Sequence, residues 1–166
     1  MGSISNAVLV EFTKPVLMFP EAAPSTSTSI FVSLSKAARI SIIIMGTTNG
    51  TGGASAITLN QAKTSGGGSS KALAFSTYYN CAGIIAGTPN DTYVATAVSS
   101  NTYNTPTTAS QSFVNIIEVR GTDLDVNNGF AFVQLAMATQ SHVTLTVLGL
   151  VRDIRWPDIS PPTSLS

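Results

Sequence analysis

The chain of 166 residues is long enough for one domain with a substantial core, since 43% of its residues are hydrophobic. Only 10% are charged, against about 25% in an average globular protein. Eight basic and eight acidic residues give a formal net charge of zero. This balance excludes long-range attraction to nucleic acid or to an anionic membrane, so we expect neither as a partner.

Targeting and redox signals are sparse in the sequence. The N-terminal stretch "MGSISNAVLVEFTKPVLMF" lacks the basic region and the unbroken apolar run of a secretory signal. No segment approaches the ~20 consecutive apolar residues that span a membrane. A single cysteine, Cys81, allows no internal disulfide. We therefore expect a soluble protein that is made in a cytoplasm.

The first part of the chain, residues 1–27, is predicted to form a strand near 7–12 followed by an extended arm. Prolines recur between residues 13 and 29, together with a Ser/Thr run. Proline removes a backbone donor and is excluded from central strands, which favours an arm over a sheet strand. Leu17 and Phe19 are the apolar side chains that we expect this arm to place against a neighbouring subunit.

Residues 28–152 carry short β-prone runs that are separated by Gly, Asn, Asp, Ser and Pro. The stretch "HVTLTVLGLV" shows the alternation of a half-buried strand most clearly. These runs predict an all-β fold: a single antiparallel β-sandwich, jelly-roll-like, between extended N- and C-terminal arms. The predicted strands lie near 7–12, 28–35, 39–45, 54–62, 71–79, 91–98, 112–120, 129–138 and 142–152.

The C-terminal residues 153–166, "DIRWPDISPPTSLS", are predicted to form a second extended arm, because their prolines disfavour a sheet. Trp156 stands between Arg155 and Pro157, outside any core pattern. A large apolar ring on an extended segment typically anchors in a pocket. We expect Ile154, Trp156 and Ile159 to contact neighbouring subunits, either a like copy or another protein.

The glycine-rich stretch "KTSGGGSSKA", residues 63–72, is the nearest approach to a phosphate-binding loop. Such a loop needs G-x-x-x-x-G-K-[ST] between a strand and a helix. Here Lys71 is followed by Ala72, and the residues after it favour a strand. The glycines therefore predict a turn between two strands.

The stretch "DLDVNNG", residues 123–129, resembles the start of a calcium loop. Asp123, Asp125 and Asn127 match its first ligand positions, but Asn128 stands where glycine is required. The twelfth position, which should be a bidentate glutamate, is Gln134. We predict a turn here, with no metal and no cofactor anywhere in the chain.

No arrangement of residues predicts catalysis. His142 is the only histidine, no G-x-S-x-G motif occurs, and Cys81 has no second histidine with which to form a metal site. Among the eight acids, only Glu11 and Glu118 fall clearly within predicted strands. We therefore expect a protein that is not an enzyme. A hydrolase with His142 or an acid pair in a cleft remains the weakest alternative.

Three segments together carry a family resemblance: "ITLNQAKTSGGGSSKALAF", "NDTYVATAVSSNTYNT" and "FVNIIEVRGTDLDVNNGFAFVQLAMA". Over roughly residues 55–150 their order resembles that of head auxiliary proteins, the decoration or cement proteins of tailed bacteriophages. The chain departs from that pattern at Ala131, where relatives often have an acidic residue.

The resemblance implies a non-enzymatic virion protein that binds the outer capsid surface and stabilises the shell. Its implied partners are the major capsid protein and further copies of itself, as a dimer or trimer, and its implied location is the capsid surface. One alternative is a carbohydrate- or receptor-binding sandwich module of a phage tail. That alternative needs several exposed aromatic side chains on one face or along one set of loops, whereas the tyrosines of this sequence, Tyr78, Tyr79, Tyr93 and Tyr103, are scattered.

Overall fold

The computed structural model describes residues 13–22, 27–50, 53–84, 92–137 and 142–154. Within these ranges the chain forms twelve strands and two short 3-10 helices, η1 (Gly121–Asp123) and η2 (Val126–Asn128). The strands are β1 (Thr13–Ala22), β2 (Ser27–Thr28), β3 (Val32–Ser33), β4 (Ala37–Thr48), β5 (Ala56–Ala62), β6 (Lys71–Ala72), β7 (Thr77–Ile84), β8 (Val94–Ala97), β9 (Thr102–Asn104), β10 (Ser112–Arg120), β11 (Phe132–Met137) and β12 (Val143–Ile154).

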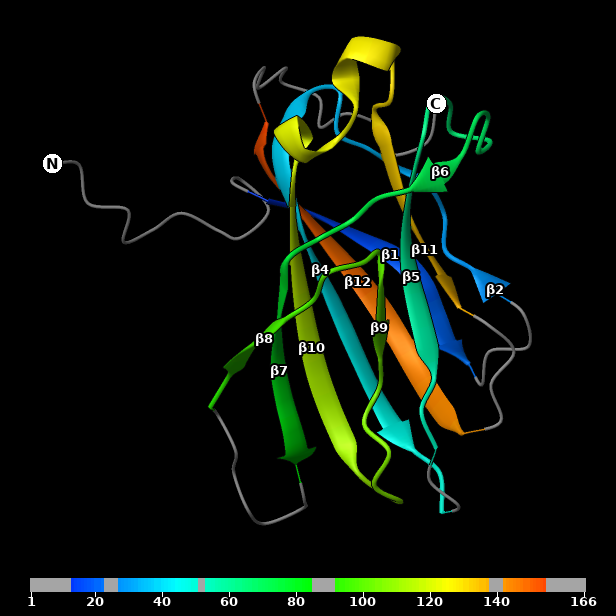
Figure 1. The fold of residues 1–166 in the computed structure, drawn as a ribbon, viewed down its shortest axis with the longest axis vertical. Coiled ribbons are helices and arrows are strands. Elements are labelled where there is room, and N and C mark those ends of the chain that lie inside the picture. The colour runs from blue at the N-terminus through cyan, green and yellow to red at the C-terminus, as the bar shows by residue number, and fades with distance from the viewer. Residues whose placement is uncertain (1–12, 23–26, 51–52, 85–91, 138–141, 155–166) are drawn as a thin grey trace, which may run out of the picture.

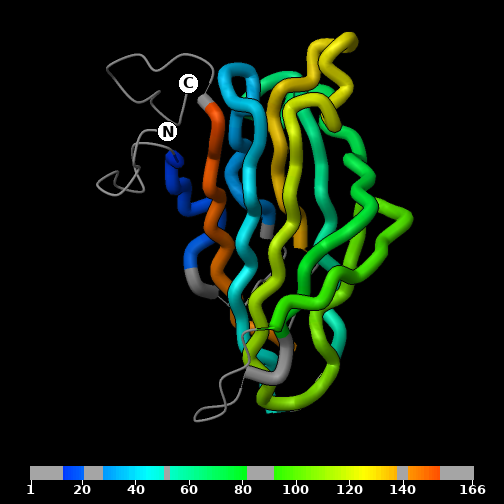
Figure 2. Tube along the Cα trace, turned by 90° about the vertical axis from the view of Figure 1, so that its left-hand side faces the viewer, coloured from blue at the N-terminus to red at the C-terminus, as the bar shows by residue number. Residues whose placement is uncertain are grey.

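The strands form two antiparallel sheets that pack together. Sheet A has the order β1-β12-β4-β10-β7-β8, and Figure 2 shows its strands side by side, from blue β1 through orange β12 and cyan β4 to β10. Sheet B has the order β2-β11-β5-β6, with β3 also beside β11 and β9 also beside β5. The prediction of an all-β antiparallel sandwich is confirmed.

The pairing follows the order of a jelly roll. Strands from the first half of the chain pair with strands from the second half in reverse order: β1 with β12, β2 and β3 with β11, β4 with β10, and β5 with β9. One long folded ribbon that is rolled over a core gives this pattern. The hairpin of β7 and β8 extends sheet A beyond it.

The core lies between the sheets and is built by alternation along each strand. In β4, Ile40, Ile42 and Ile44 point inward and are fully buried. Across the core, Leu59 of β5 and Leu135 of β11 are equally buried. The inward positions of both sheets form one continuous cluster.

The prediction of an extended arm beginning at residue 13 is wrong. Residues Thr13–Ala22 form β1, the edge strand of sheet A, and pair with β12 from Thr13↔Arg152 to Ala22↔Leu145. The prolines are compatible with a strand at this place because an edge strand needs only one side of its backbone paired. The strand predicted at 7–12 lies outside the described residues.

Two other departures concern short strands. The run predicted at 71–79 is divided between β6 in sheet B and β7 in sheet A, because the chain crosses from one sheet to the other at residues 73–76. Strand β9 lies in polar and turn-forming residues between the strands predicted at 91–98 and 112–120, where no strand was predicted. Among the described residues, no helix offers the length and apolar character that a membrane crossing needs.

Candidate functional site

Of the five predicted assembly contacts, two side chains can be placed. Leu17 is 56% exposed on β1, whereas Phe19 is only 6% exposed. The register of β1 against β12 shifts between Leu17 and Phe19, which is the mark of a β-bulge, and Met18 and Phe19 are both buried there. Phe19 thus belongs to the core of its own chain and is not available to a neighbour.

The other three predicted contacts lie at the C-terminus. Ile154 is the last residue of β12 and pairs with Ala37 of β4. Trp156 and Ile159 lie outside the described residues.

The strand registers bring six apolar side chains together on the outer face of sheet A. Leu17 pairs with Leu148, Leu148 with Ile43, and Ile43 with Ile116. Ile116 pairs in turn with Tyr79, and Tyr79 with Ala95. Paired residues in a sheet point to the same face. This set, which we call the apolar row, consists of Leu17, Leu148, Ile43, Ile116, Tyr79 and Ala95.

The apolar row continues into the pairs on either side of it. On one side Pro15 lies beside Leu150, and this row becomes polar at Ser41 and Glu118. On the other side Met45 lies beside Val114. Leu17, Met45 and Tyr79 are all exposed, whereas Ile43, Ile116 and Leu148 are half-buried. Over the described residues, the outer face of sheet A therefore has a partly exposed apolar centre, the apolar band.

Polar side chains bound the apolar band at both ends of the strands. At one end Thr47 lies between Thr144 and Ser112, and its hydroxyl is 3.1 Å from that of Ser112. At the other end Arg39 lies between Arg152 and Arg120. An apolar centre with a polar rim is the anatomy of a protein interface.

Ion pairs hold the arginine side chains in place at the end of the face that carries Arg39 and Arg152. The Arg39 Nε atom lies 2.7 Å from Asp153 Oδ2, and the Arg152 guanidinium lies 2.9 Å from Glu118 Oε1. Arg152 also donates a hydrogen bond to the Ser41 hydroxyl. These exposed pairs contribute little to stability, but they fix the side chains that border the face.

The two edges of sheet A differ. In β1, Lys14, Pro15 and Pro20 put a charge and two proline rings on the edge strand, which blocks addition of another strand. In β8, the sequence "VATA" holds neither charge nor proline, and three of its four residues are exposed. Among the described residues, β8 has no strand on its far side.

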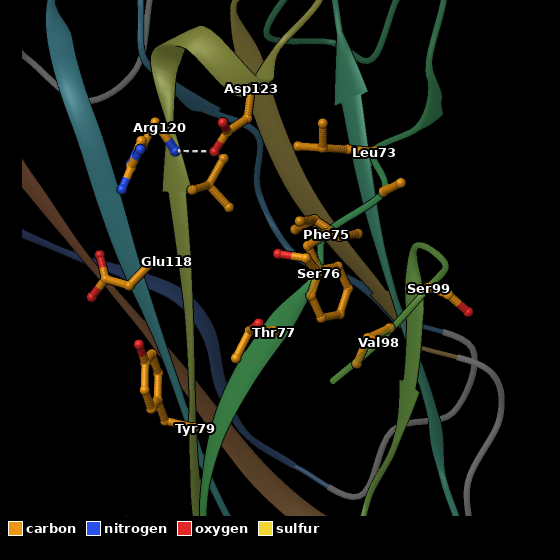
Figure 3. Close-up of a pocket in the computed structure, with 13 residues that line it drawn as sticks. Leu73, Phe75, Ser76, Thr77, Tyr79, Val98, Ser99, Glu118, Arg120 and Asp123 are labelled. Atoms are coloured by element: carbon orange, nitrogen blue, oxygen red, sulfur yellow. Dashed lines mark hydrogen bonds between the residues drawn. The ribbon is translucent and has the colours of Figure 1, made fainter. Parts of the chain in front are cut away.

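A hollow of about 730 Å³ opens beside the end of β10 (Figure 3). The last pair between β10 and β7 is Ile116↔Tyr79, so the two strands part beyond it. The chain that crosses between the sheets supplies one wall of the hollow, with Phe75, Ser76 and Thr77. Its floor reaches the buried side chains of Leu59 and Val119.

The glycine-rich stretch is a turn, as the sequence predicts. It joins β5 to β6, with Gln61 paired to Lys71. The Gly67 φ of +81° is a left-handed conformation that glycine adopts without strain. The backbone N–H of Gly68 donates to the Thr64 hydroxyl over 2.9 Å, which closes the loop on itself.

The "DLDVNNG" stretch forms η1 and η2 and binds the glycine-rich turn. The Lys71 ammonium donates to the Asp125 carboxylate, and this hydrogen bond lowers the pKa of Asp125. Lys71 also lies 4.2 Å from the centre of the Phe130 ring. The Asp125 N–H donates to Gln61 Oε1 over 2.9 Å. Asp125 therefore links the segment of η1 and η2 to the two strands that flank the glycine-rich turn, β5 and β6.

His142 and Cys81, the residues considered above for catalysis and for a metal site, both pack against other parts of the chain. The His142 ring lies against the backbone of Gly53, where even a methyl group would come within 2.7 Å of the ring. Cys81 is buried in β7. The part of the chain that the structure describes contains no group of three or more His, Cys, Asp or Glu side chains arranged to hold a metal ion.

A small polar cluster lies inside the sandwich. Asn80 and Asn115 face each other across β7 and β10, on the inner face of sheet A. Tyr103 of β9 stacks on Tyr78 with ring centres 4.8 Å apart. The Oδ1 atoms of both asparagines and the Tyr103 hydroxyl are buried without a hydrogen-bond partner. Burial raises the pKa of Tyr103 well above its usual value.

Sequence reasoning identified neither the apolar row nor the hollow. A signal for the row is present in the run Ile42-Ile43-Ile44, in which the residue between two core positions is itself apolar. The rest of the row depends on registers between strands that are far apart in the sequence. The hollow depends on where β7 and β10 part, which no local pattern predicts.

Comparison with known proteins gives few likenesses. No protein family model matches the chain, and no curated protein sequence matches it significantly. Among solved structures, the crystal structure of SPBc2 prophage-derived protein YomS aligns with 85% of this chain and 93% of that one. The TM-score is 0.44 and the sequence identity is 12%. At this level of similarity no shared family is established.

Proposed function

We propose that the protein is a non-enzymatic structural protein of a bacteriophage virion that binds the outer capsid surface and stabilises the shell. The observation that carries the proposal is the apolar row on the outer face of sheet A. Its location is then the capsid surface, and its main partner is the major capsid protein. The resemblance of residues 55–150 to head auxiliary proteins supports the same function.

The size of the face suits a protein partner. Neighbouring strands lie about 4.8 Å apart, so a row across six strands is about 24 Å long. With the flanking pairs, the apolar band reaches several hundred Å², which is the scale of a functional patch on a soluble protein. A standard interface buries about 800 Å² on each partner. The band and its polar rim supply most of that area.

The low charge of the chain supports docking on a shell. Charged groups that are buried at an interface must be stripped of water. On this face Arg39, Arg120, Arg152 and Glu118 gather toward one end of the strands, beyond the apolar row. Each contact contributes modestly, but a symmetric shell repeats it over many copies. A protein that clamps neighbouring shell subunits therefore gains stability through repetition.

Homo-oligomerisation is part of the proposal, and the β8 edge is the place where it would occur. A second copy can add its own β8 in antiparallel pairing, which a two-fold axis permits. The β1 edge, with its lysine and prolines, does not permit such pairing.

A second candidate function, a carbohydrate- or receptor-binding module of a phage tail, is favoured by the hollow beside β10. The two candidates differ in where the protein sits on the virion. Immunogold labelling of particles separates them, because gold on the head supports the first and gold on the tail supports the second.

The direct test is co-sedimentation of the purified protein with capsids that lack it. The row variant Leu17→Thr is compared with Val126→Thr, since these residues are 56% and 57% exposed and only Leu17 belongs to the apolar row. We expect Leu17→Thr to weaken capsid binding about tenfold and Val126→Thr to leave it unchanged. Equal binding by both variants contradicts the docking face.

A further inference from the structure

The hollow beside β10 combines an exposed aromatic ring with hydrogen-bonding groups. Figure 3 shows Tyr79 and Glu118 on one side of it and Phe75 and Val98 on the other. Tyr79 is 43% exposed, and Phe75 is half-buried. Ser76, Thr77 and Ser99 also line the hollow. Aromatic rings together with hydroxyl-bearing residues suit a ligand that has both flat apolar faces and polar edges.

The carboxylates on the rim keep free acceptor capacity. Asp123 accepts a hydrogen bond from the Arg120 N–H through Oδ2 over 2.8 Å. Glu118 receives the Arg152 guanidinium through Oε1. Each carboxylate retains a second oxygen, and each is held in place by the bond it already makes. Such oriented acceptors can bind neighbouring hydroxyl groups of a ligand.

The charge balance of the hollow offers no advantage to anions. Its lining includes two carboxylates, Glu118 and Asp123, and one cation, Arg120. Arg152, 2.9 Å from Glu118, brings the local charges into balance, so a phosphate or nucleotide would meet no excess of positive charge. A purely apolar ligand would leave the hydroxyls and carboxylates without partners, which is costly. A neutral polyhydroxylated ligand avoids this cost and needs no excess of positive charge.

The volume sets the length of such a ligand. Sites for small ligands in proteins measure about 300–1,000 Å³, and this hollow measures about 730 Å³. It therefore has room for a few sugar rings but not for a folded chain. We propose that this hollow is a binding site for a neutral oligosaccharide, with one sugar ring on the Tyr79 face and its hydroxyls donating to Glu118 and Asp123.

The test uses the full chain and three neutral trisaccharides, maltotriose, cellotriose and chitotriose, by saturation-transfer NMR and titration. We expect saturable binding of at least one, with a Kd of about 1 mM or tighter. Tyr79→Ala should weaken it about tenfold or more. The matched control Tyr93→Ala, 46% exposed and absent from the hollow, should not.

Glu118→Gln is the second variant, because it keeps the size of the side chain while removing the negative charge. We expect weaker binding with an unchanged melting temperature. Absence of saturable binding by the unchanged protein, or equal loss in Tyr79→Ala and Tyr93→Ala, overturns the proposal. The inference rests on the second candidate function, carbohydrate binding, and Tyr79 also belongs to the apolar row. Because capsids are absent from this experiment, its failure is distinguishable from a failure of shell binding.

Discussion

Sheet A has apolar residues at the centre of both faces, yet among the described residues only the inner face packs against a second sheet. Along β4, Ile42 and Ile44 point into the core and are fully buried, whereas Ile43 between them points outward into the apolar row. The inner isoleucines face sheet B. The outer isoleucine is flanked only by Leu148 and Ile116 on the neighbouring strands.

If the protein has the function proposed above, this difference separates the residues needed for folding from those needed for recognition. A sheet that is solvated on one face normally alternates apolar and polar residues. Threonine, which is polar and favours strands, would therefore suit the outer positions of β4. The chain uses apolar residues there instead, without burying them in its own core. Inner-face variants should therefore reduce stability, while outer-face variants should reduce binding and leave the fold intact.

The largest stability loss is expected from Ile44→Ala on the inner face. Removing a fully buried isoleucine side chain leaves a cavity, which typically costs about 2–5 kcal/mol. Urea unfolding followed by circular dichroism measures the free energy of unfolding. A loss below about 1 kcal/mol would mean that the inner face is not packed as described.

A smaller loss is expected from Gly46→Ala, one step further along the same face. A Cβ atom at Gly46 would come within 2.8 Å of both the Phe113 ring and the Thr144 carbonyl oxygen. The backbone contact cannot give way easily, so we expect a loss of about 1–3 kcal/mol. Gly50→Ala is the control, because nothing lies within 4 Å of its added Cβ. Equal melting temperatures for the two variants would contradict this close approach.

We expect alkaline pH to reduce the stability of the protein through Tyr103, a buried polar residue between the sheets. Burial raises the folded-state pKa of Tyr103, so its stabilising contribution is complete below the unfolded pKa of about 10. It is lost as pH rises above that value, because the unfolded chain then releases its proton first. In Tyr103→Phe this part of the pH dependence should disappear, as measured by melting temperature from pH 8 to 11. An unchanged alkaline slope would show that Tyr103 is not the group responsible.

The smallest stability effect is expected from Ile43→Thr in the apolar row. Threonine is also β-branched and suits a strand, and substitutions at partly exposed positions usually change stability by about 0.5 kcal/mol or less. Capsid binding should nevertheless fall. If Ile43→Thr destabilises the protein as much as Ile44→Ala, the outer face contributes to folding and the distinction between the two faces is lost.

Much of the fold follows from alternation that is visible in the sequence. The runs that became β4, β5, β10, β11 and β12 each place apolar residues at every second position, which predicts both the strands and their buried face. An extended arm was wrongly predicted at β1 because proline was taken to exclude a strand. At a sheet edge it is tolerated, and edge position is a property of the assembled sheet rather than of the segment.

The proposed docking face and the hollow were less predictable because they are assembled across strands. Leu17 was predicted to be a contact residue from its segment alone, but its neighbour in the row, Leu148, lies at the other end of the chain. Phe19 was misplaced because a β-bulge, which moves two consecutive side chains inward, leaves no reliable local mark. Pairing registers are set by packing of the whole core, so the row becomes visible only in the folded protein.

Cryo-electron microscopy of capsids decorated with the purified protein tests the central claim most directly, because the orientation of the sandwich on the shell can be read from the map. We predict that the outer face of sheet A lies against the shell, with Leu17, Ile43 and Leu148 at the contact and sheet B facing solvent. Density that places sheet B against the shell, or capsids that carry no added density at saturating protein, would contradict this account.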